Sequence, residues 1–411
     1  MKSKIWFILF FITQSSTVFS QSVSTSPYSI YGLGSLYDSD FGSITSIGSS
    51  GIALPSDSFI NNKNPASLGF IGKYSFFFDT GMKGIQTTYE STTSSEKRDN
   101  FQFSHIAMAF SINSKSGVSI SLKPYSSATY LISNYKIPIT NSDEFYYLNS
   151  KSSGGINSFD LSYGYKIQKK STLGLTTSFY FGNINDNKDF SIANSITNIN
   201  KKSFYHGIRF NLGNQIQIDS TFNIGITLKT PTKLSASKTQ SVTTSNQTET
   251  QYLETDLNSD VTDYYLPFEF GVGFSKSFKK NISLTFDYEK SFWNGTNQTN
   301  LYGKFKNQDK FALGLSYVKK ERSIYFSDRI HYFSGINYDT GFLSINNKSI
   351  NNIAFSVGVG IPIDNTKSLL NITYSYGQKG NIGSDFIKEN YHKIGINLSL
   401  EGIWFVKRKY D

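Results

Sequence analysis

Apolar and polar residues alternate with a period of two along most of this chain. The segment 159–167 places Phe, Leu, Tyr, Tyr and Ile at its odd positions and Asp, Ser, Gly and Lys at its even ones. The same alternation recurs in 173–181, 266–274 and 282–288 and in several later segments. Because successive side chains of a strand point to opposite faces, the pattern predicts strands with one apolar and one polar face.

Fourteen such segments can be counted after residue 73, and most have nine or more residues, enough to cross a bilayer when tilted. The predicted strands cover 74–90, 99–112, 118–134, 156–168, 171–183, 203–218, 221–236, 264–278, 281–293, 308–319, 323–342, 350–362, 367–378 and 391–406.

The connections between these strands alternate in length. Short turns are predicted at 113–117, 168–170, 219–220, 279–280, 319–322 and 364–367, and long polar loops at 91–98, 135–155, 184–202, 237–263, 294–307, 343–349 and 379–390. Outer-membrane barrels show this sorting, with the short turns in the periplasm. A β-sandwich normally has shorter strands, and no repeat of 20–50 residues supports a solenoid. We therefore predict an all-β fold, a 14-stranded antiparallel transmembrane β-barrel.

The first twenty residues predict export. Lys2 and Lys4 precede the apolar run 5–12, and small residues at 18–20 suit cleavage before Gln21, so residues 1–20 read as a signal peptide. The chain has no cysteine, which excludes disulfides and thiolate metal sites. The two lysines contribute to a net charge of +10, and no dense Lys/Arg cluster supports nucleic-acid binding. We interpret the basic balance as surface charge near anionic lipid headgroups.

The polar face of the strands should line the interior of the barrel. It is rich in glycine, which strands tolerate where another backbone comes close. It also carries charges that we expect to pair with one another, and we assign none of them a catalytic role. These inward charges are Asp160, Lys166, Arg209, Lys229, Glu269, Asp287, Glu289, Lys393 and Glu401.

Residues 21–72 precede the predicted barrel of residues 73–411 and show short apolar clusters without a steady period. A free tail would leave those side chains in water, whereas a barrel of this size has a lumen wide enough to need filling. We predict that 21–72 forms an N-terminal plug, or hatch, inside the lumen.

Several motifs give the chain a resemblance to a known family. Gly51, Ala53, Asp57, the run 64–66 (Asn-Pro-Ala) and Leu68 resemble the plug signature of FadL-type outer-membrane proteins. The stretches "SPYSIYGLG" (26–34) and "WFVKRKY" (404–410) resemble Bacteroidota-type members. The resemblance implies a fourteen-stranded barrel with an N-terminal hatch in the outer membrane.

The resemblance also implies passive uptake of hydrophobic, fatty-acid-like small molecules through a hatch-gated passage, with no cofactor. It places Asn64, Pro65 and Ala66 at the hinge of the hatch, and Phe59, Leu68 and Phe70 beside the passage. Simple packing of a plug explains the same six residues equally well.

A second function belongs to another class. Some FadL-like proteins of Bacteroidota resemble transporters but serve as partner subunits of larger outer-membrane machines, in type IX secretion or barrel assembly. The polar stretch 237–263 is a candidate docking surface for a protein partner. A closed lumen without a continuous apolar pocket would favour this role over transport.

Enzymatic activity is the third option, and we expect the protein not to be an enzyme. His105, His206, His331 and His392 fall on different predicted strands, each among many Ser and Asn residues, and nothing selects one catalytic set.

Overall fold

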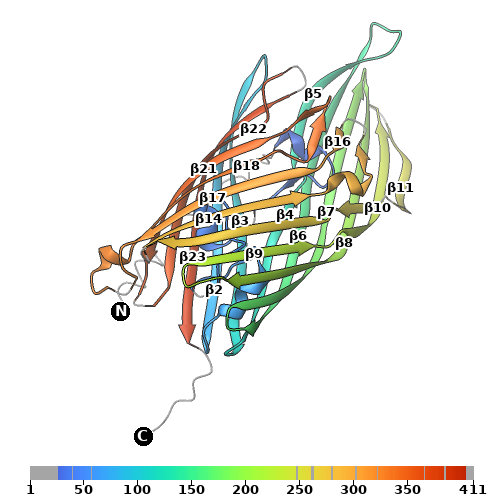
Figure 1. The fold of residues 1–411 in the computed structure, drawn as a ribbon. Helices are drawn as coiled ribbons and strands as arrows, with labels where there is room; N and C mark the ends of the chain where they lie inside the picture. Colours follow the sequence, from blue (N-terminus) through green and yellow to red (C-terminus); the bar gives the residue numbers. More distant parts are fainter. Residues whose placement is uncertain are drawn as a thin grey trace, which may run out of the picture.

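The computed structural model describes residues 26–38, 40–56, 58–246, 249–260, 263–278, 281–300, 303–321, 323–364, 366–383 and 386–403. These residues form a closed antiparallel barrel of fourteen strands, as the alternation predicted (Figure 1). The leader 1–20, Asp57 and the motif 404–410 lie outside the described residues.

The barrel strands follow one another around the ring in chain order. They are β2 (Ser75–Glu90), β3 (Ser95–Asn113), β4 (Ser116–Ser127), β6 (Phe145–Gln168), β7 (Ser171–Ile192), β8 (Ser195–Gln217), β9 (Phe222–Lys229), β13 (Glu269–Phe278), β14 (Ile282–Ser291), β17 (Gln308–Val318), β18 (His331–Asp339), β21 (Asn352–Pro362), β22 (Leu369–Lys379) and β23 (Lys388–Ile403). The last strand, β23, pairs with the first, β2, in a register that joins Phe78 to Leu400, and this pairing closes the ring.

The two faces of the barrel wall are chemically opposite. On β6, Phe159 and Leu161 are exposed on the outer surface, whereas Asp160 and Ser162 between them are buried. The same outward apolar parity holds around the ring, so the expectation that the apolar face points outward is confirmed. Exposed apolar area on this scale marks a surface that contacts something other than water.

Three stretches predicted as polar loops are strands instead, and that prediction was wrong. Residues 135–155, 184–202 and 237–263 contribute to long hairpins that include β5 (Tyr130–Pro138), β10 (Thr232–Ser245) and β11 (Thr250–Asp260). As a result β6 has 24 residues and β8 has 23, whereas β13 and β14 have 10 each. Apolar residues in these segments, such as Tyr147, Ile184 and Ile196, follow no sustained alternation, so no strand was predicted, and cross-strand hydrogen bonding keeps the segments extended. We call this taller side, with β5, β10, β11 and the outer halves of β6, β7 and β8, the extended wall.

Two further differences concern the connections. The strand predicted for 323–342 begins only at His331, after a turn that contains the 3-10 helix η5 (Phe326–Arg329). The segments 294–307 and 343–349, predicted as loops, contain a small four-stranded sheet of β15 (Thr299–Asn300), β16 (Gly303–Phe305), β19 (Leu343–Ile345) and β20 (Lys348–Ser349). The helix η4 (Trp293–Thr296) precedes it, and β12 (Tyr264–Leu266) pairs with β10.

The N-terminal segment, defined here as the described residues from 26 to 72, packs against the inner faces of opposite sides of the ring (Figure 1, blue). Its elements are η1 (Pro27–Ile30), β1 (Ser35–Leu36), η2 (Gly42–Ile47) and η3 (Pro65–Phe70). Helix η3 contacts β4, β6, β7 and β8, and η2 contacts β17, β18, β21 and β22. Among the described residues no helix is long and apolar enough to cross a membrane.

Candidate functional site

The inward glycines of the wall form a seat for the N-terminal segment. A Cβ atom added to Gly174 would lie within 3 Å of the backbone of Pro65 and Ala66, and one added to Gly225 within 3 Å of Ile52. The same holds for Gly164, Gly213, Gly314, Gly335 and Gly358 against residues between Ser46 and Leu68. The absence of side chains at these positions is what lets the segment's backbone approach the wall.

Asn64 connects η3 to the rest of the segment and to the wall. Its Oδ1 accepts a hydrogen bond from Ala66 N at 3.0 Å as the N-cap of η3, and Pro65 occupies the first helical position. Its Nδ2 donates to Ile52 O at 2.9 Å and to Asn214 O on β8 at 3.0 Å. Asn64 is fully buried, so its amide satisfies groups on both sides of the interface.

A wall carboxylate holds the turn that precedes η3. Asp287 Oδ2 on β14 accepts hydrogen bonds from Gly51 N at 2.6 Å and Ile52 N at 3.0 Å. Gln215 Nε2 on β8 donates to Ile52 O at 2.8 Å. Strands from different parts of the ring therefore bind the same short piece of backbone.

On another side of the ring, an aromatic contact holds the start of η2 against the wall. The ring of Phe41 stacks on that of His105 with centroids 3.9 Å apart and planes 16° from parallel. His105 Nε2 lies 2.5 Å from Asp79 Oδ1, and Asn397 Nδ2 donates to the same oxygen at 2.6 Å. All four residues are buried, so this histidine belongs to a closed polar network under the N-terminal segment.

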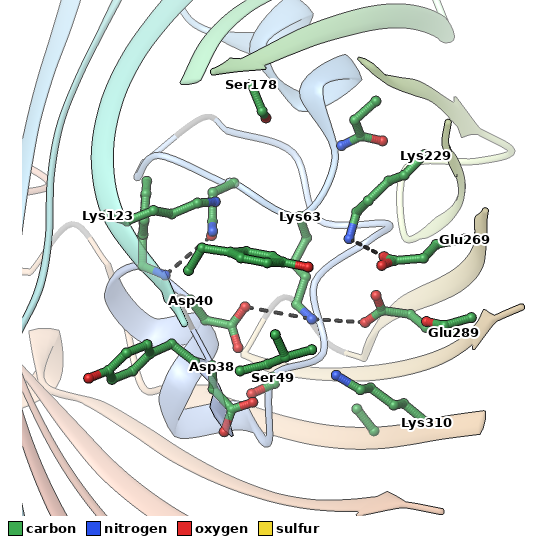
Figure 2. A pocket seen from close by; sticks show the side chains of 18 of the residues that line it. Asp38, Asp40, Ser49, Lys63, Lys123, Ser178, Lys229, Glu269, Glu289 and Lys310 are labelled. Carbon is green, nitrogen blue, oxygen red and sulfur yellow. Dashed lines mark hydrogen bonds and ion pairs between the residues drawn. The ribbon is translucent and has the colours of Figure 1, made fainter. Parts of the chain in front are cut away.

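Charged residues line a cavity of about 210 Å³ between the N-terminal segment and the wall (Figure 2). Lys63 Nζ lies 2.8 Å from Glu289 Oε1 and 3.6 Å from Asp40 Oδ1. Glu269 accepts from Arg209 at 3.2 Å and from Lys229 at 2.8 Å. The expected pairing of inward charges is therefore confirmed for Arg209, Lys229 and Glu269.

Other inward charges pair with partners that the alternation did not identify. Asp160 pairs with Lys123 at 3.0 Å, and Lys393 with Asp38 of the N-terminal segment at 3.6 Å. Burial lowers the pKa of Lys63, but Asp40 and Glu289 raise it by more, so the pKa lies above its usual value. The lysine therefore carries its charge inside the barrel.

A second cavity of about 250 Å³ lies toward the end of the barrel that carries the long connections. Its lining mixes apolar side chains with charged ones. The apolar members include Tyr31, Leu36, Ile85, Phe342, Leu343 and Ile350, and the cationic members include Lys83, Lys310, Lys379 and Lys393. Neither cavity, within the described residues, is lined by continuous apolar surface.

The connections at that end fold over the lumen. Trp293 is fully buried, and its ring stacks on Phe342 with centroids 4.7 Å apart. Phe305 of the small sheet lies 5.5 Å from the Trp293 ring, and Tyr28 and Leu33 of the N-terminal segment belong to the same buried cluster. This apolar core was not predicted from the sequence, because single aromatic residues in polar stretches give no periodic signal.

The six site residues named from the sequence lie on or near η3. Asn64, Pro65 and Ala66 are buried at the wall, and Leu68 is buried in a cluster with Phe41, Ile60 and Phe77. Phe59 is half-buried, as is Phe70, whose ring lies 5.1 Å from Lys166 Nζ. Of the six, Pro65 alone lines either of the two cavities described above.

Several solved structures that are similar to this barrel are hydrocarbon channels. The toluene transporter TodX of Pseudomonas putida matches with a TM-score of 0.63 at 11% identity over 90% of this chain and 99% of that one. The monoaromatic hydrocarbon channel CymD matches with a TM-score of 0.60 at 13% identity over 88% and 97%. The toluene transporter TbuX of Ralstonia pickettii matches with 0.57 at 14% identity over 88% and 98%. At such identities the likeness shows a shared fold of FadL type. No curated protein matches the sequence.

The sequence itself matches a family model over its whole length. The model is that of BamG, and the match runs over residues 1–411. The N-terminal segment and the barrel both fall within it. This chain is a member of the BamG family.

Proposed function

We propose that this protein is an outer-membrane barrel whose lumen is filled by an N-terminal plug, and that it acts as a non-transporting partner subunit of an outer-membrane machine in type IX secretion or barrel assembly. The main support is the lumen: ion pairs, buried hydrogen bonds and glycine contacts join the N-terminal segment to opposite walls. The two cavities beside it are charged or mixed in lining.

The outer-membrane location rests on the surface of the barrel. Its outward side chains are aromatic and aliphatic around the ring, which suits contact with lipid. The FadL-type fold of the solved channels and the leader-like residues 1–20 support the same location. Origin in the Bacteroidota, suggested by the motifs at both ends of the chain, remains a prediction.

Moving the plug would break many contacts at once. Separating Lys63 from Glu289 would break a charged hydrogen bond in a largely buried site, and such a bond contributes about 1.5–3 kcal/mol. Asn64 would lose its acceptors on Ile52 and Asn214. These costs favour the packing role of residues 64–66 over the role of a hinge.

The partner would meet the protein outside the membrane. The predicted docking stretch 237–263 contains the hairpin β10–β11, in which Tyr252 and Leu253 are 72% and 63% exposed. Apolar side chains on a polar hairpin suit contact with a protein. This is the surface that we assign to a partner subunit.

Passive uptake of hydrophobic small molecules is the second candidate, and two observations favour it. The barrel shares its fold with hydrocarbon channels, and the second cavity offers apolar side chains beside lysines, as an amphipathic ligand would require. In this reading Phe59, Leu68 and Phe70 lie beside a passage that opens when the hatch moves. The channels share only 10–14% of residues with this chain, so their cargo is not carried over to it.

Purification of the full chain from native membranes in mild detergent separates the two candidates. Proteins and lipids that co-purify are identified by mass spectrometry, and a Tyr252→Ser/Leu253→Ser variant serves as the comparison. The partner role predicts stoichiometric outer-membrane proteins that are lost from the variant. Bound hydrophobic molecules without any stoichiometric protein would refute the partner role and support uptake.

A further inference from the structure

Two adjacent rows of polar side chains cross the outer face of the extended wall. The pairing registers of β6, β7, β8 and β10 define them. The first row is Ser153, Asn185, Lys202 and Thr239, and the second is Lys151, Asn187, Asn200 and Ser241. Together with Phe204 these residues line a concave groove of about 610 Å³, which we call the wall groove.

The wall groove begins where the apolar band of the barrel ends. On β8 the outward residues Phe210, Ile208 and Phe204 are exposed and apolar, with the exposed His206 among them, and the outward position after Phe204 is Lys202. On β7 the exposed Phe179 and Phe181 are followed at the same parity by Asn183 and then by Asn185. In a membrane this boundary falls at the level of lipid headgroups, at the end of the barrel that carries the long connections.

Among the described residues, the two lysines of the wall groove have no acidic partner. Lys151 and Lys202 are exposed, and no described carboxylate pairs with either of them, in contrast to Lys63, Lys123 and Lys229 in the lumen. Lys202 Nζ lies 5.0 Å from the centroid of the Phe204 ring. The nearest acid along β7 on this face is Asp189, one row farther out, whose Oδ1 accepts from Asn198 at 2.5 Å. An anion at the wall groove would therefore meet two free ammonium groups.

The neighbours of the lysines suit a sugar. Amides and hydroxyls both donate and accept hydrogen bonds, as vicinal hydroxyl groups of a sugar do, and an aromatic ring at the edge offers an apolar face. Lys151 and Lys202 are two strands and one side-chain row apart. At the usual spacing of strands and residues in a sheet, this separation is about 12 Å. Two phosphates on one disaccharide-sized headgroup can contact both.

The geometry points to the wall groove as a binding site for the phosphorylated sugar headgroup of a glycolipid in the outer leaflet. The site rests on the proposed placement in the outer membrane, and it is independent of whether the protein assembles with partners or transports a ligand. The lysines bind phosphates, the amide and hydroxyl rows bind the sugars, and Phe204 lies at the boundary with the acyl chains.

The test measures binding of a bisphosphorylated disaccharide glycolipid to the purified full-length protein in neutral detergent micelles. The variant is Lys151→Gln/Lys202→Gln. The matched control is Lys201→Gln/Lys238→Gln, which removes the same charge from the opposite face of the same wall. Both variants keep polar side chains on the sheet, and unchanged thermal unfolding shows that each is folded.

We expect the glycolipid to bind the wild type and the control equally, and the groove variant at least about tenfold more weakly, since each lost ammonium–phosphate hydrogen bond is worth at least that factor. The dephosphorylated glycolipid should lose a similar factor on the wild type. Equal binding to wild type and groove variant overturns the site. Equal affinity for phosphatidylglycerol micelles or for inorganic phosphate overturns recognition of the sugar headgroup. Failure to recover partner proteins from membranes would refute the proposed function but would leave this result unchanged.

Discussion

Lys63 of the N-terminal segment donates a hydrogen bond to Glu289 on β14 across 2.8 Å, and Asp40 of the same segment lies 3.6 Å from its ammonium group (Figure 2). One lysine thus joins two parts of the segment to the wall in a largely buried site. Because opposite charges in such a site stabilise each other only while both are present, this contact gives the lumen a defined, closed arrangement.

Glu289→Gln should destabilise the folded protein by about 2–3 kcal/mol, because Lys63 loses a charged hydrogen bond and keeps only Asp40. Urea unfolding in micelles measures the change. The double variant Lys63→Met/Glu289→Leu should be less destabilised than the sum of the single variants Lys63→Met and Glu289→Leu, since it removes both partners of the pair and leaves only Asp40 without its lysine. Simple additivity of the two single effects would show that the pair does not couple segment and wall.

A methyl group on the glycine seat should displace the N-terminal segment. Gly174→Ala puts a Cβ within 3 Å of the Pro65 and Ala66 backbone, and we expect a loss of about 1–3 kcal/mol together with faster proteolysis inside residues 26–72. Gly84→Ala on β2 is the matched control, because nothing lies within 4 Å of its added Cβ. Equal cleavage rates in the two variants would contradict the seat.

The variant Asn64→Ala distinguishes a packing role of Asn64 from a role at the hinge of a hatch. It removes the N-cap of η3 and the hydrogen bonds to Ile52 and Asn214, so we expect a loss of about 2 kcal/mol and greater permeability of cells to a large polar dye. Asn157→Ala, on the exposed outer face of β6, should change neither. A hinge would show the reverse: unchanged stability with loss of hydrophobic uptake.

The barrel could be predicted from the sequence because its wall has one apolar and one polar face. Alternation at 159–167 identifies both the strand and its outward face, and the inward parity identified Asp160, Arg209 and Glu269. The lysines that pair with Asp160 and with Glu289 could not be identified in this way: Lys123 lies on another strand, and Lys63 lies in a segment whose shape is set by contacts and not by a period.

The extended wall and the apolar core at the same end could not be predicted from the sequence, for related reasons. Residues 184–202 carry only scattered apolar side chains, such as Ile184, Phe190 and Ile196, so cross-strand bonding forms the strands without a sustained amphipathic pattern. Trp293 is fully buried by Phe305 and Phe342, which are distant in sequence. Such contacts depend on the completed ring and leave no local signature.

A reversible disulfide between the N-terminal segment and the wall shows whether the lumen opens in function. Ser46 of η2 and Thr373 of β22 are in hydrogen-bond contact through their side-chain oxygens, and the chain has no native cysteine, so Ser46→Cys/Thr373→Cys should form one disulfide between segment and wall. The measurement is recovery of stoichiometric partner proteins, and uptake of a labelled hydrophobic molecule, before and after reduction. We expect the locked and the reduced protein to recover the same partners and to show the same uptake. Uptake that stops in the locked protein and returns on reduction would contradict this expectation, because the lumen would then open in function.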